Sequence, residues 1–226
     1  MKLLIKASKV IDGNGAQPIR DGAILIEDTL ITKVCTQRQL TSDDKSGADI
    51  LSYSHGTAMP GFIEMHSHVH CSAEYNAYQQ VTTESNETLL MRGTKAVRDA
   101  LCSGVTTMRD LGSKNEVVFP IKDAIERYII PGPRLIAAGT PITTTGGHCH
   151  MFGSEADTSS EVIRAIRQQS KIGADWVAYQ DLADLEAAVR EVNPQLTRFD
   201  TSCFSGTYVT GGVDSAFLAH QARIRN

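Results

Sequence analysis

Short apolar segments typical of strands alternate with segments of helical periodicity in the part of the chain that follows Pro60. The expected strands cover residues 61–65, 105–108 and 135–138, with a further strand beginning near Trp176, and the expected helices cover residues 87–102, 117–128 and 158–172. Such alternation is typical of a parallel sheet built from β-α units. A closed barrel of eight units takes about 250 residues, so we expect an α/β fold with an incomplete (β/α) TIM-type barrel of about four units.

The first 59 residues follow a different pattern. Apolar segments at residues 3–5, 23–26 and 31–34 are separated by turn-forming stretches at residues 12–15 and 20–22. Short strands broken by Asp-Gly and Asn-Gly turns predict a small β-sheet unit. The polar segment at residues 41–47 is expected to be a loop within it.

The alternation of strands and helices stops in the last fifty residues. We expect a helix over residues 182–192, a hairpin over residues 199–210 and a last helix over residues 214–224. The chain is therefore predicted to have three parts: a β-sheet segment over 1–59, a half barrel over 60–176 and an α+β tail over 177–226.

Composition and charge indicate which classes of binding partner to expect. The net charge is −4 and the charged residues are spread along the chain without a basic patch, so we expect no nucleic-acid partner. No apolar run reaches the ~18 residues of a membrane helix, so we expect no membrane partner. The five cysteines include no Cys-x-x-Cys pair, which suits reduced thiols in the cytoplasm.

Two histidines follow the first strand of the expected barrel. His66 and His68 are spaced i, i+2, so on a strand both side chains point to the same face. A neutral imidazole can donate a lone pair to zinc or a similar divalent ion, which in turn lowers the pKa of bound water. The alternative is a metal-free pair of hydrogen-bonded polar side chains. His70, two residues further, is expected to be a solvated loop histidine.

Several motifs of residues 1–176 resemble the amidohydrolase superfamily, in particular its imidazolonepropionase-like and Xaa-Pro or Xaa-Arg dipeptidase-like branch. The motifs are Met59-Pro60-Gly61 with His66-Ser67-His68, residues 104–110, Thr145-Gly146-Gly147-His148 and residues 173–176. The resemblance implies a β/α barrel and a small β-sandwich partly built from the N-terminus. It also implies one or two divalent metals, zinc being expected, which activate water against a carbon–nitrogen bond of a small molecule or dipeptide. His66 and His68 would be metal ligands.

The same resemblance implies a role for His148. In that branch, a histidine that follows two glycines after the third strand faces the substrate, and His148 is the matching residue. The glycines let the backbone bend close to a ligand, and a neutral imidazole can donate to a carbonyl or carboxylate. The alternative is an ordinary surface loop. Arg109 and Asp110, at the end of the second strand, are expected to form a structural ion pair.

Later positions depart from the family pattern. The resembling family has a metal-bridging lysine on the fourth strand, where this chain has Ala178, and His220 is the one histidine after His150. Two imidazoles are half of a tetrahedral zinc shell. We therefore expect a metal-dependent hydrolase that is impaired in this chain, or alternatively a non-catalytic half barrel with weak metal binding. Open sheet edges would favour self-association.

The tail has a resemblance of its own. Residues 179–182, 188–190, 193–194 and 204–210 look like the C-terminal end of amidophosphoribosyltransferase, whose glutamine-cleaving cysteine and phosphoribosyl pyrophosphate loop have no match here. Residues 172–175 resemble both the amidohydrolase pattern and the amidophosphoribosyltransferase pattern. The hypothesis is a fusion of part of an amidohydrolase with an unrelated tail.

Overall fold

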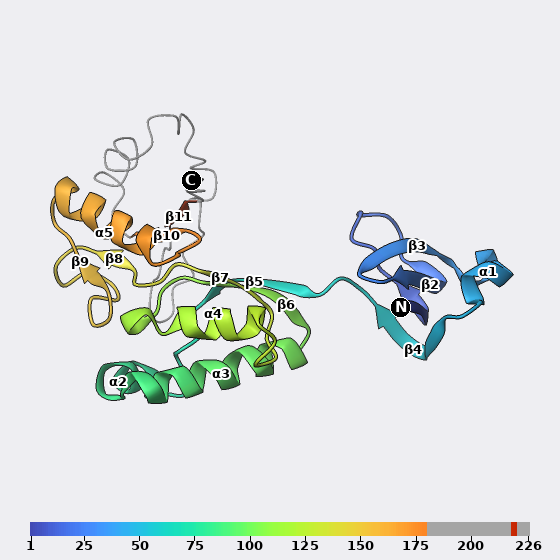
Figure 1. Ribbon diagram of the computed structural model, residues 1–226, viewed down its shortest axis with the longest axis horizontal. Helices are drawn as coiled ribbons and strands as arrows, with labels where there is room; N and C mark the ends of the chain where they lie inside the picture. Colours follow the sequence, from blue (N-terminus) through green and yellow to red (C-terminus); the bar gives the residue numbers. More distant parts are fainter. Residues whose placement is uncertain (180–217, 221–226) are drawn as a thin grey trace. The chain divides into compact units, whose positions relative to one another are not determined.

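The computed structural model describes residues 1–179 and 218–220. The chain divides into two compact units, Met1–Gly61 and Phe62–Asn226 (Figure 1). The helix expected over 182–192 and the hairpin expected over 199–210 lie outside the described residues. Each unit is considered by itself below.

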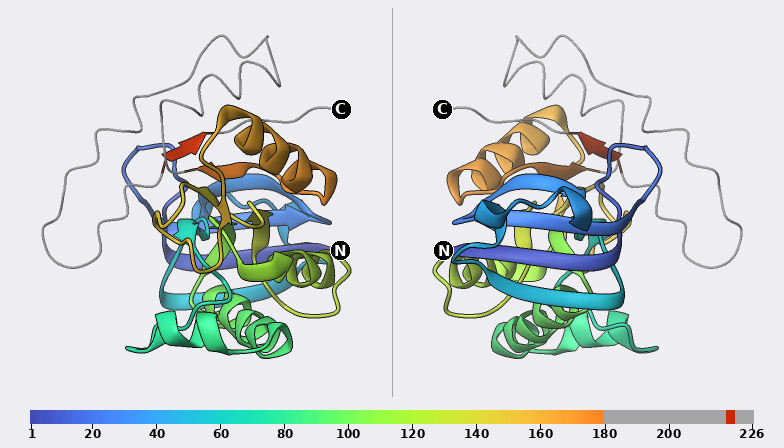
Figure 2. Two further views of the ribbon diagram at one scale, coloured as in Figure 1. Left: turned by 90° about the vertical axis from the view of Figure 1, so that its left-hand side faces the viewer. Right: turned by 90° about the vertical axis from the view of Figure 1, so that its right-hand side faces the viewer.

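The first unit is a single four-stranded sheet in the order β3-β2-β1-β4 (Figure 2). Its strands are β1 (Lys2–Val10), β2 (Ile19–Glu27), β3 (Leu30–Thr36) and β4 (Asp49–Ala58). β2 is antiparallel to β1 and β3, whereas β4 is parallel to β1. The predicted β-sheet unit is thus confirmed, but within Met1–Gly61 it comprises one sheet without a second sheet facing it.

A small apolar core stabilises this sheet. It consists of Leu4, Ala23, Leu25 and Leu40. Residues 41–47, predicted as a loop, contain the short helix α1 (Ser42–Lys45), and a 3₁₀ turn (Gln37–Gln39) precedes them. α1 is capped by Thr41, and Lys33 on β3 pairs with Asp44 at 2.6 Å. These local bonds order a polar segment that lacks a hydrophobic pattern.

The second unit contains the parallel sheet that the alternating pattern predicts. β5 (Phe62–Ser67), β6 (Val105–Asp110) and β7 (Arg134–Ala137) run parallel in the order β5-β6-β7. Four further short strands form a second sheet in the order β11-β10-β8-β9: β8 (Ile142–Thr143), β9 (Ser154–Glu155), β10 (Val177–Tyr179) and β11 (Leu218–His220). The described strands do not close into a barrel.

One prediction for the tail is wrong at residues 218–220. The sequence suggested a helix over 214–224, whereas β11 is a strand that pairs antiparallel with β10. A run of helix-compatible residues is a weak signal, and pairing with an adjacent strand overrides it.

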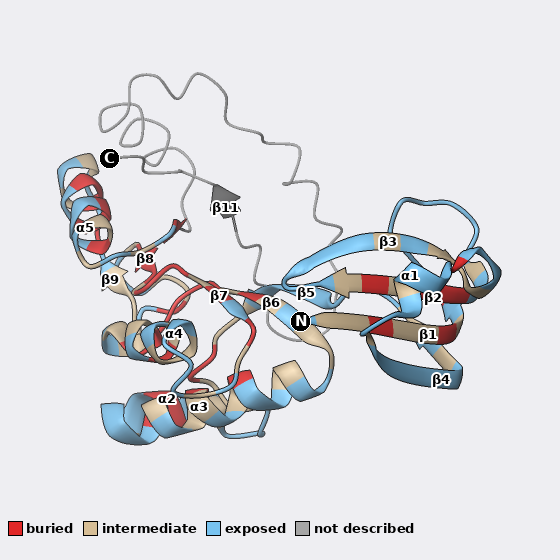
Figure 3. Ribbon diagram, turned by 45° about the vertical axis from the view of Figure 1, so that its right-hand side comes forward, coloured by how far each residue is buried: buried red, intermediate tan, exposed pale blue. Residues whose placement is uncertain are grey.

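The helices of this unit are α2 (Ala77–Thr83), α3 (Asn86–Cys102), α4 (Val118–Glu126) and α5 (Ser159–Lys171), with a 3₁₀ turn at Lys114–Glu116. All but α2 were predicted; α2 is a polar segment that buries Gln80 and Val81. Figure 1 shows α3 and α4 side by side along the sheet. Figure 3 shows buried residues on the strands and on the inward faces of the helices. Among the described residues, no helix combines the length and apolar character needed to cross a membrane.

The largest core cluster lies where α3 and α4 cover the sheet. Its buried members are Val69, Leu89, Val97, Met108, Val117, Val118, Ile121, Leu135 and Ala137. They come from β6, β7, both helices and the loop after β5. Packing this loop into the core fixes the position of the residues that follow β5.

The N-terminus of α5 has a capping box. Thr158 accepts a hydrogen bond from the Glu161 backbone N–H, and the Glu161 side chain accepts from the Thr158 N–H in return. We expect Thr158→Ala to lower the free energy of unfolding of this unit by about 1 kcal/mol, because the Glu161 N–H loses its acceptor and the Glu161 carboxylate loses the hydrogen bond from the Thr158 hydroxyl. Thr158→Ser retains the oxygen and should stay close to the wild type. Urea unfolding followed by the fluorescence of Trp176, the sole tryptophan, measures both. Equal losses in the two variants would contradict the prediction.

Candidate functional site

His66 and His68 come together at the carboxyl end of β5. Their ring centroids are 5.7 Å apart and the ring planes are inclined by 73°. Ser67 between them points elsewhere, and its hydroxyl donates to the Arg109 carbonyl of β6 at 3.1 Å. The i, i+2 spacing therefore brings the two imidazoles to one place, as the sequence predicted.

The ring of His68 has a defined hydrogen-bond partner. Its Nδ1 lies 2.8 Å from the carbonyl oxygen of Gly112. A carbonyl can only accept, so Nδ1 carries the proton and Nε2 keeps its lone pair. Burial lowers the pKa of His68 and that of His66, and His66 is the less buried of the two. The lowered pKa favours the neutral form of both rings. Both rings are thus in the form that can ligate a cation.

Asp110 is a buried carboxylate directly behind His68. Its two oxygens accept hydrogen bonds from the backbone N–H of Val69 at 2.8 Å and of Gly112 at 3.0 Å. Burial raises the pKa of Asp110 to about 7, while the two N–H donors act in the opposite direction. The carboxylate ties the loop after β5 to the loop after β6.

Arg109, the neighbour of Asp110, makes different contacts from the expected ion pair. Its Nε donates to the Met65 carbonyl of β5 at 2.8 Å, and its Cζ lies 4.6 Å from the centroid of the Trp176 ring. The charge of Arg109 lowers the pKa of His66, to which it is close. Consecutive residues of a strand point to opposite faces, so Arg109 and Asp110 have separate structural roles.

The loop that carries His148 approaches the histidine pair. A charge on His148 would lower the pKa of both His66 and His68, so the three rings lie within electrostatic reach, and burial lowers the pKa of His148 itself. Gly147 is needed in this loop because a Cβ there would lie 2.4 Å from the Thr143 hydroxyl. His148 therefore acts electrostatically on both histidines of the pair, and its contact with a substrate stays a prediction.

His70 is the site residue that sequence reasoning misplaced. It is completely buried, not solvated. The Phe152 ring lies against both His70 and His68, with centroid distances of 5.2 and 5.9 Å. The Nδ1 atom of His70 has no hydrogen-bond partner in the described part of the chain. Continuation of the alternation from His66 through His68 to His70 was the signal that could have predicted its inward direction.

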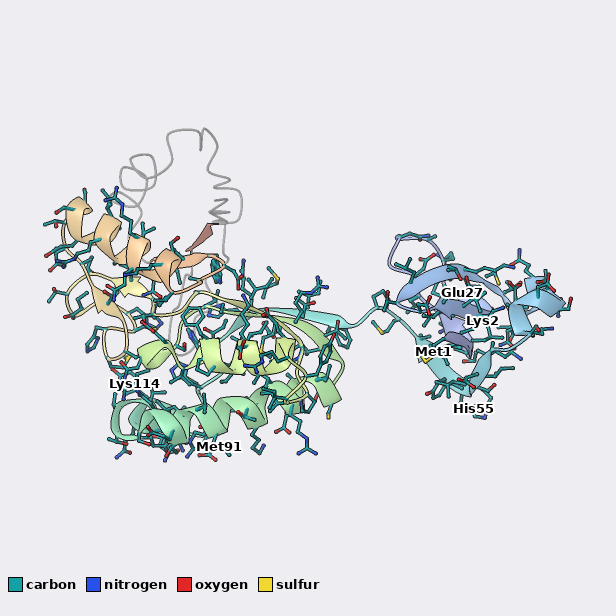
Figure 4. All side chains as sticks on the ribbon, viewed as in Figure 1. Met1, Lys2, Glu27, His55, Met91 and Lys114 are labelled. Atoms are coloured by element: carbon teal, nitrogen blue, oxygen red, sulfur yellow. The ribbon has the colours of Figure 1, made fainter. Side chains whose placement is uncertain are left out.

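Lys114 joins two elements close to His70, whose pKa its charge lowers. It follows β6, and its ammonium donates to the Val81 carbonyl at 2.7 Å and the Thr82 carbonyl at 3.3 Å, at the C-terminal end of α2. Figure 4 shows Lys114 beside the helix layer. A polar groove with a volume of about 520 Å³ lies between Lys114, Thr140 and Phe152. The groove reaches Phe152, whose ring lies against His68 and His70.

The side chains around the histidine pair fit part of the ligand set of a metal ion. The neutral rings of His66 and His68 and the Nδ1 bond of His68 fit two nitrogen ligands of a divalent metal. Within residues 1–179 and 218–220, however, no group of three His, Cys, Asp or Glu side chains could hold a metal. Ala178, at the position where the resembling family has lysine, is a buried residue of β10 without a donor atom. The described residues therefore fit half of a metal shell.

Comparison with known families gives a match over more than half of the chain. The model of the amidohydrolase family matches residues 57–188. The match includes β5 to β10 and the four histidines His66, His68, His70 and His148. It also runs past residue 176, into the part predicted as the tail.

Solved structures and a curated enzyme agree with this match. A Xaa-Pro dipeptidase structure has a TM-score of 0.67 and 27% identity, covering 79% of this chain and 47% of that one. The ochratoxinase of Aspergillus niger is 25% identical over 225 residues, which is 87% of this chain and 45% of the enzyme, and its crystal structure has a TM-score of 0.67. The chain spans less than half the length of these relatives.

A second similarity concerns a smaller part of the chain. The amidophosphoribosyltransferase of Pseudomonas aeruginosa is 40% identical over 81 residues, which is 34% of this chain and 16% of that enzyme. This similarity is partial, as the motifs of the tail suggested. It spans more residues than the fifty of the predicted tail.

Proposed function

This chain belongs to the amidohydrolase family, and from that membership we propose that it acts in metal-dependent hydrolysis of a carbon–nitrogen bond. The proposed substrates are amides, cyclic amides or dipeptides of small size. The observation that carries the proposal is the hydrogen bond from His68 Nδ1 to the Gly112 carbonyl beside His66, since it puts the proton on Nδ1 and the lone pair on Nε2.

In this proposal His66 and His68 hold a divalent metal, with zinc as the first candidate. Such an ion, when bound, supplies a water molecule of lowered pKa and polarises a carbonyl oxygen. The remaining ligands must come from outside the described residues or from solvent. The proposed role of His148 is to orient the substrate carbonyl or carboxylate from the neighbouring loop.

The architecture proposed with this function is the opening half of a (β/α) TIM-type barrel. The supporting observations are the parallel order β5-β6-β7, the helices that cover it, and the return of the chain to β10. The sheet of Met1–Gly61 is proposed to be one part of a β-sandwich. The exposed Phe62 and Ile63 on the edge strand β5 support self-association through the open edge.

A second function is favoured by one specific observation. Ala178 supplies no ligand where the resembling family has lysine, and the described residues complete no metal shell. The alternative proposal is therefore a non-catalytic half barrel that binds metal weakly. The two proposals differ in turnover and in metal stoichiometry.

Hydrolysis of small substrates tests the first proposal. The protein is loaded with zinc, cobalt or manganese and incubated with a panel of Xaa-Pro dipeptides, other dipeptides and N-acyl amides, with product amine as the readout. Turnover that requires metal supports the hydrolase. No turnover, with less than a tenth of an equivalent of tightly held metal, supports the non-catalytic alternative.

His148→Asn tests the proposed substrate contact. We expect KM to rise roughly tenfold with a smaller change in kcat, because one hydrogen bond to bound substrate is lost. His150→Asn is the matched control: His150 lies in the same loop and its Nδ1 is bonded to the Gly147 carbonyl at 3.0 Å. Equal effects of the two substitutions would remove His148 from the proposed site.

The origin of the tail is a separate proposal. The partial similarity to amidophosphoribosyltransferase supports a fusion, with the tail over residues 177–226. Sequencing of the source DNA across codons 170–182 tests it. An uninterrupted amidohydrolase reading frame in that interval would refute the fusion.

A further inference from the structure

The carboxylate of Asp110 lies at the centre of the hydrogen bonds that hold His68. One oxygen accepts from the N–H of Val69, the residue that follows His68, at 2.8 Å. The other accepts from the N–H of Gly112 at 3.0 Å, and the carbonyl of the same Gly112 accepts from His68 Nδ1 at 2.8 Å. One side chain thus contacts both the backbone leaving His68 and the residue that receives its ring.

The residues around Asp110 restrict the conformations that these hydrogen-bonded groups can adopt. Asp110 is completely buried, and its own carbonyl accepts from the Trp176 indole N–H at 3.2 Å. Gly112 has a φ of 149°, and a Cβ at this residue would lie 2.8 Å from Pro141. Only glycine suits this backbone, which directs the Gly112 carbonyl at His68.

We propose that Asp110 is a positioning residue for His68: it holds the His68 ring as the tautomer that carries its proton on Nδ1 and its lone pair on Nε2. This role depends on the proposed function only for the identity of the group that His68 Nε2 binds. Partners of this kind orient metal-ligating histidines and set their tautomer. Here the carboxylate acts indirectly, through the two peptide groups that it fixes.

A purely structural role would give a different result, and the chain offers a matched comparison. Asp175 also joins two elements through a carboxylate: it accepts from the Ala137 N–H at 2.8 Å and from the Lys122 ammonium at 2.6 Å. Asp175 therefore ties the segment before β10 to β7, and its loss should destabilise the fold without changing the His68 ring.

The test compares the wild type, Asp110→Asn and Asp175→Asn as metal-free, ¹⁵N-labelled proteins. Long-range ¹H–¹⁵N spectra of the imidazoles report which nitrogen of His68 carries the proton. Asparagine offers one acceptor oxygen, and its amide group would face the second backbone N–H, so the Gly112 peptide loses its fixed orientation. We expect the Nδ1-protonated form in the wild type and in Asp175→Asn, and a large Nε2-protonated fraction in Asp110→Asn. Zinc affinity should fall about 10–100-fold in Asp110→Asn alone.

Two outcomes would overturn the proposal. The first is a His68 tautomer that is the same in Asp110→Asn as in the wild type. The second applies if Asp110→Asn does not fold: the wild type must then show couplings across hydrogen bonds from the Val69 and Gly112 amide nitrogens to the Asp110 carboxylate carbon, together with the Nδ1-protonated ring. Absence of either overturns it. A wild type that shows both and binds no zinc instead contradicts the proposed function and leaves the role of Asp110 intact.

Discussion

Replacing His66 and His68 together by alanine is expected to abolish stoichiometric zinc binding. The two rings are the nitrogen donors that come together at the end of β5, and the described part of the chain, this site included, holds no group of three potential ligands. Loss of the groups that hydrogen-bond to a metal's ligands weakens metal sites 10–100-fold, so removal of both ligands should weaken zinc binding by more than about 100-fold. Zinc per protein chain, measured after dialysis against a weak chelator, is the readout.

The control for this experiment is the double variant His55→Ala, His150→Ala. His55 is an exposed residue of β4 in the other unit, and His150 is exposed in the loop after β8. This pair removes the same number of imidazoles without touching β5. We expect it to retain the zinc of the wild type. Equal zinc in both double variants would exclude His66 and His68 as the ligands.

The second large effect concerns the free energy of unfolding and its dependence on pH. His70 is completely buried, and its Nδ1 lacks a partner within the described residues. A buried polar atom without a partner costs about 1–3 kcal/mol. His70→Leu, which has a similar volume, should therefore stabilise the metal-free protein at pH 7, by roughly 1 kcal/mol after some loss of contact with Phe152.

The gain should increase as the pH falls. Burial, followed by the charges of His68 and Lys114, lowers the pKa of His70 to about 3 from an ordinary 6.5. Between these values the unfolded chain binds a proton that the folded protein does not, so the wild type loses stability as the pH falls below 6.5. At pH 5 this loss is about 2 kcal/mol. Asp110, whose pKa is raised, acts in the opposite direction, so the difference between His70→Leu and wild type is the quantity to measure.

Urea unfolding of both metal-free proteins at pH 7 and pH 5 measures this difference. His55→Leu serves as the control, because it removes an exposed imidazole from the other unit. A difference between His70→Leu and the wild type that stays constant between the two pH values would contradict the neutral, buried state of His70.

Sequence patterns predicted the elements whose signals are local. The helix over 87–102 corresponds to α3, and the capping box at Thr158 marks the start of α5. β4 and α2 were missed because their residues are largely polar and show no period. Their formation depends on pairing with β1 and on burial of Gln80 and Val81, which are tertiary effects.

In the site, as in the fold, sequence patterns predicted the part whose signal is local. The i, i+2 spacing alone was enough to predict that the side chains of His66 and His68 lie together, and the rest of the fold was not needed. The positions of His70 and Asp110 could not be read in this way. Burial of His70 requires Phe152 from a loop some eighty positions away, and the contacts of Asp110 join β6 to the loop after β5. Contacts between residues far apart in the sequence produce no local periodic pattern, so they could not be predicted from one.

The zinc K-edge X-ray absorption spectrum of the wild-type protein loaded with one equivalent of zinc tests most directly whether His66 and His68 are an oriented pair of nitrogen ligands. We expect two imidazole nitrogens at about 2.0–2.1 Å from the zinc, visible through the outer-shell scattering of their rings and absent in the His66→Ala, His68→Ala variant. A shell of oxygen atoms without imidazole scattering, or an unchanged spectrum in the double variant, would contradict it.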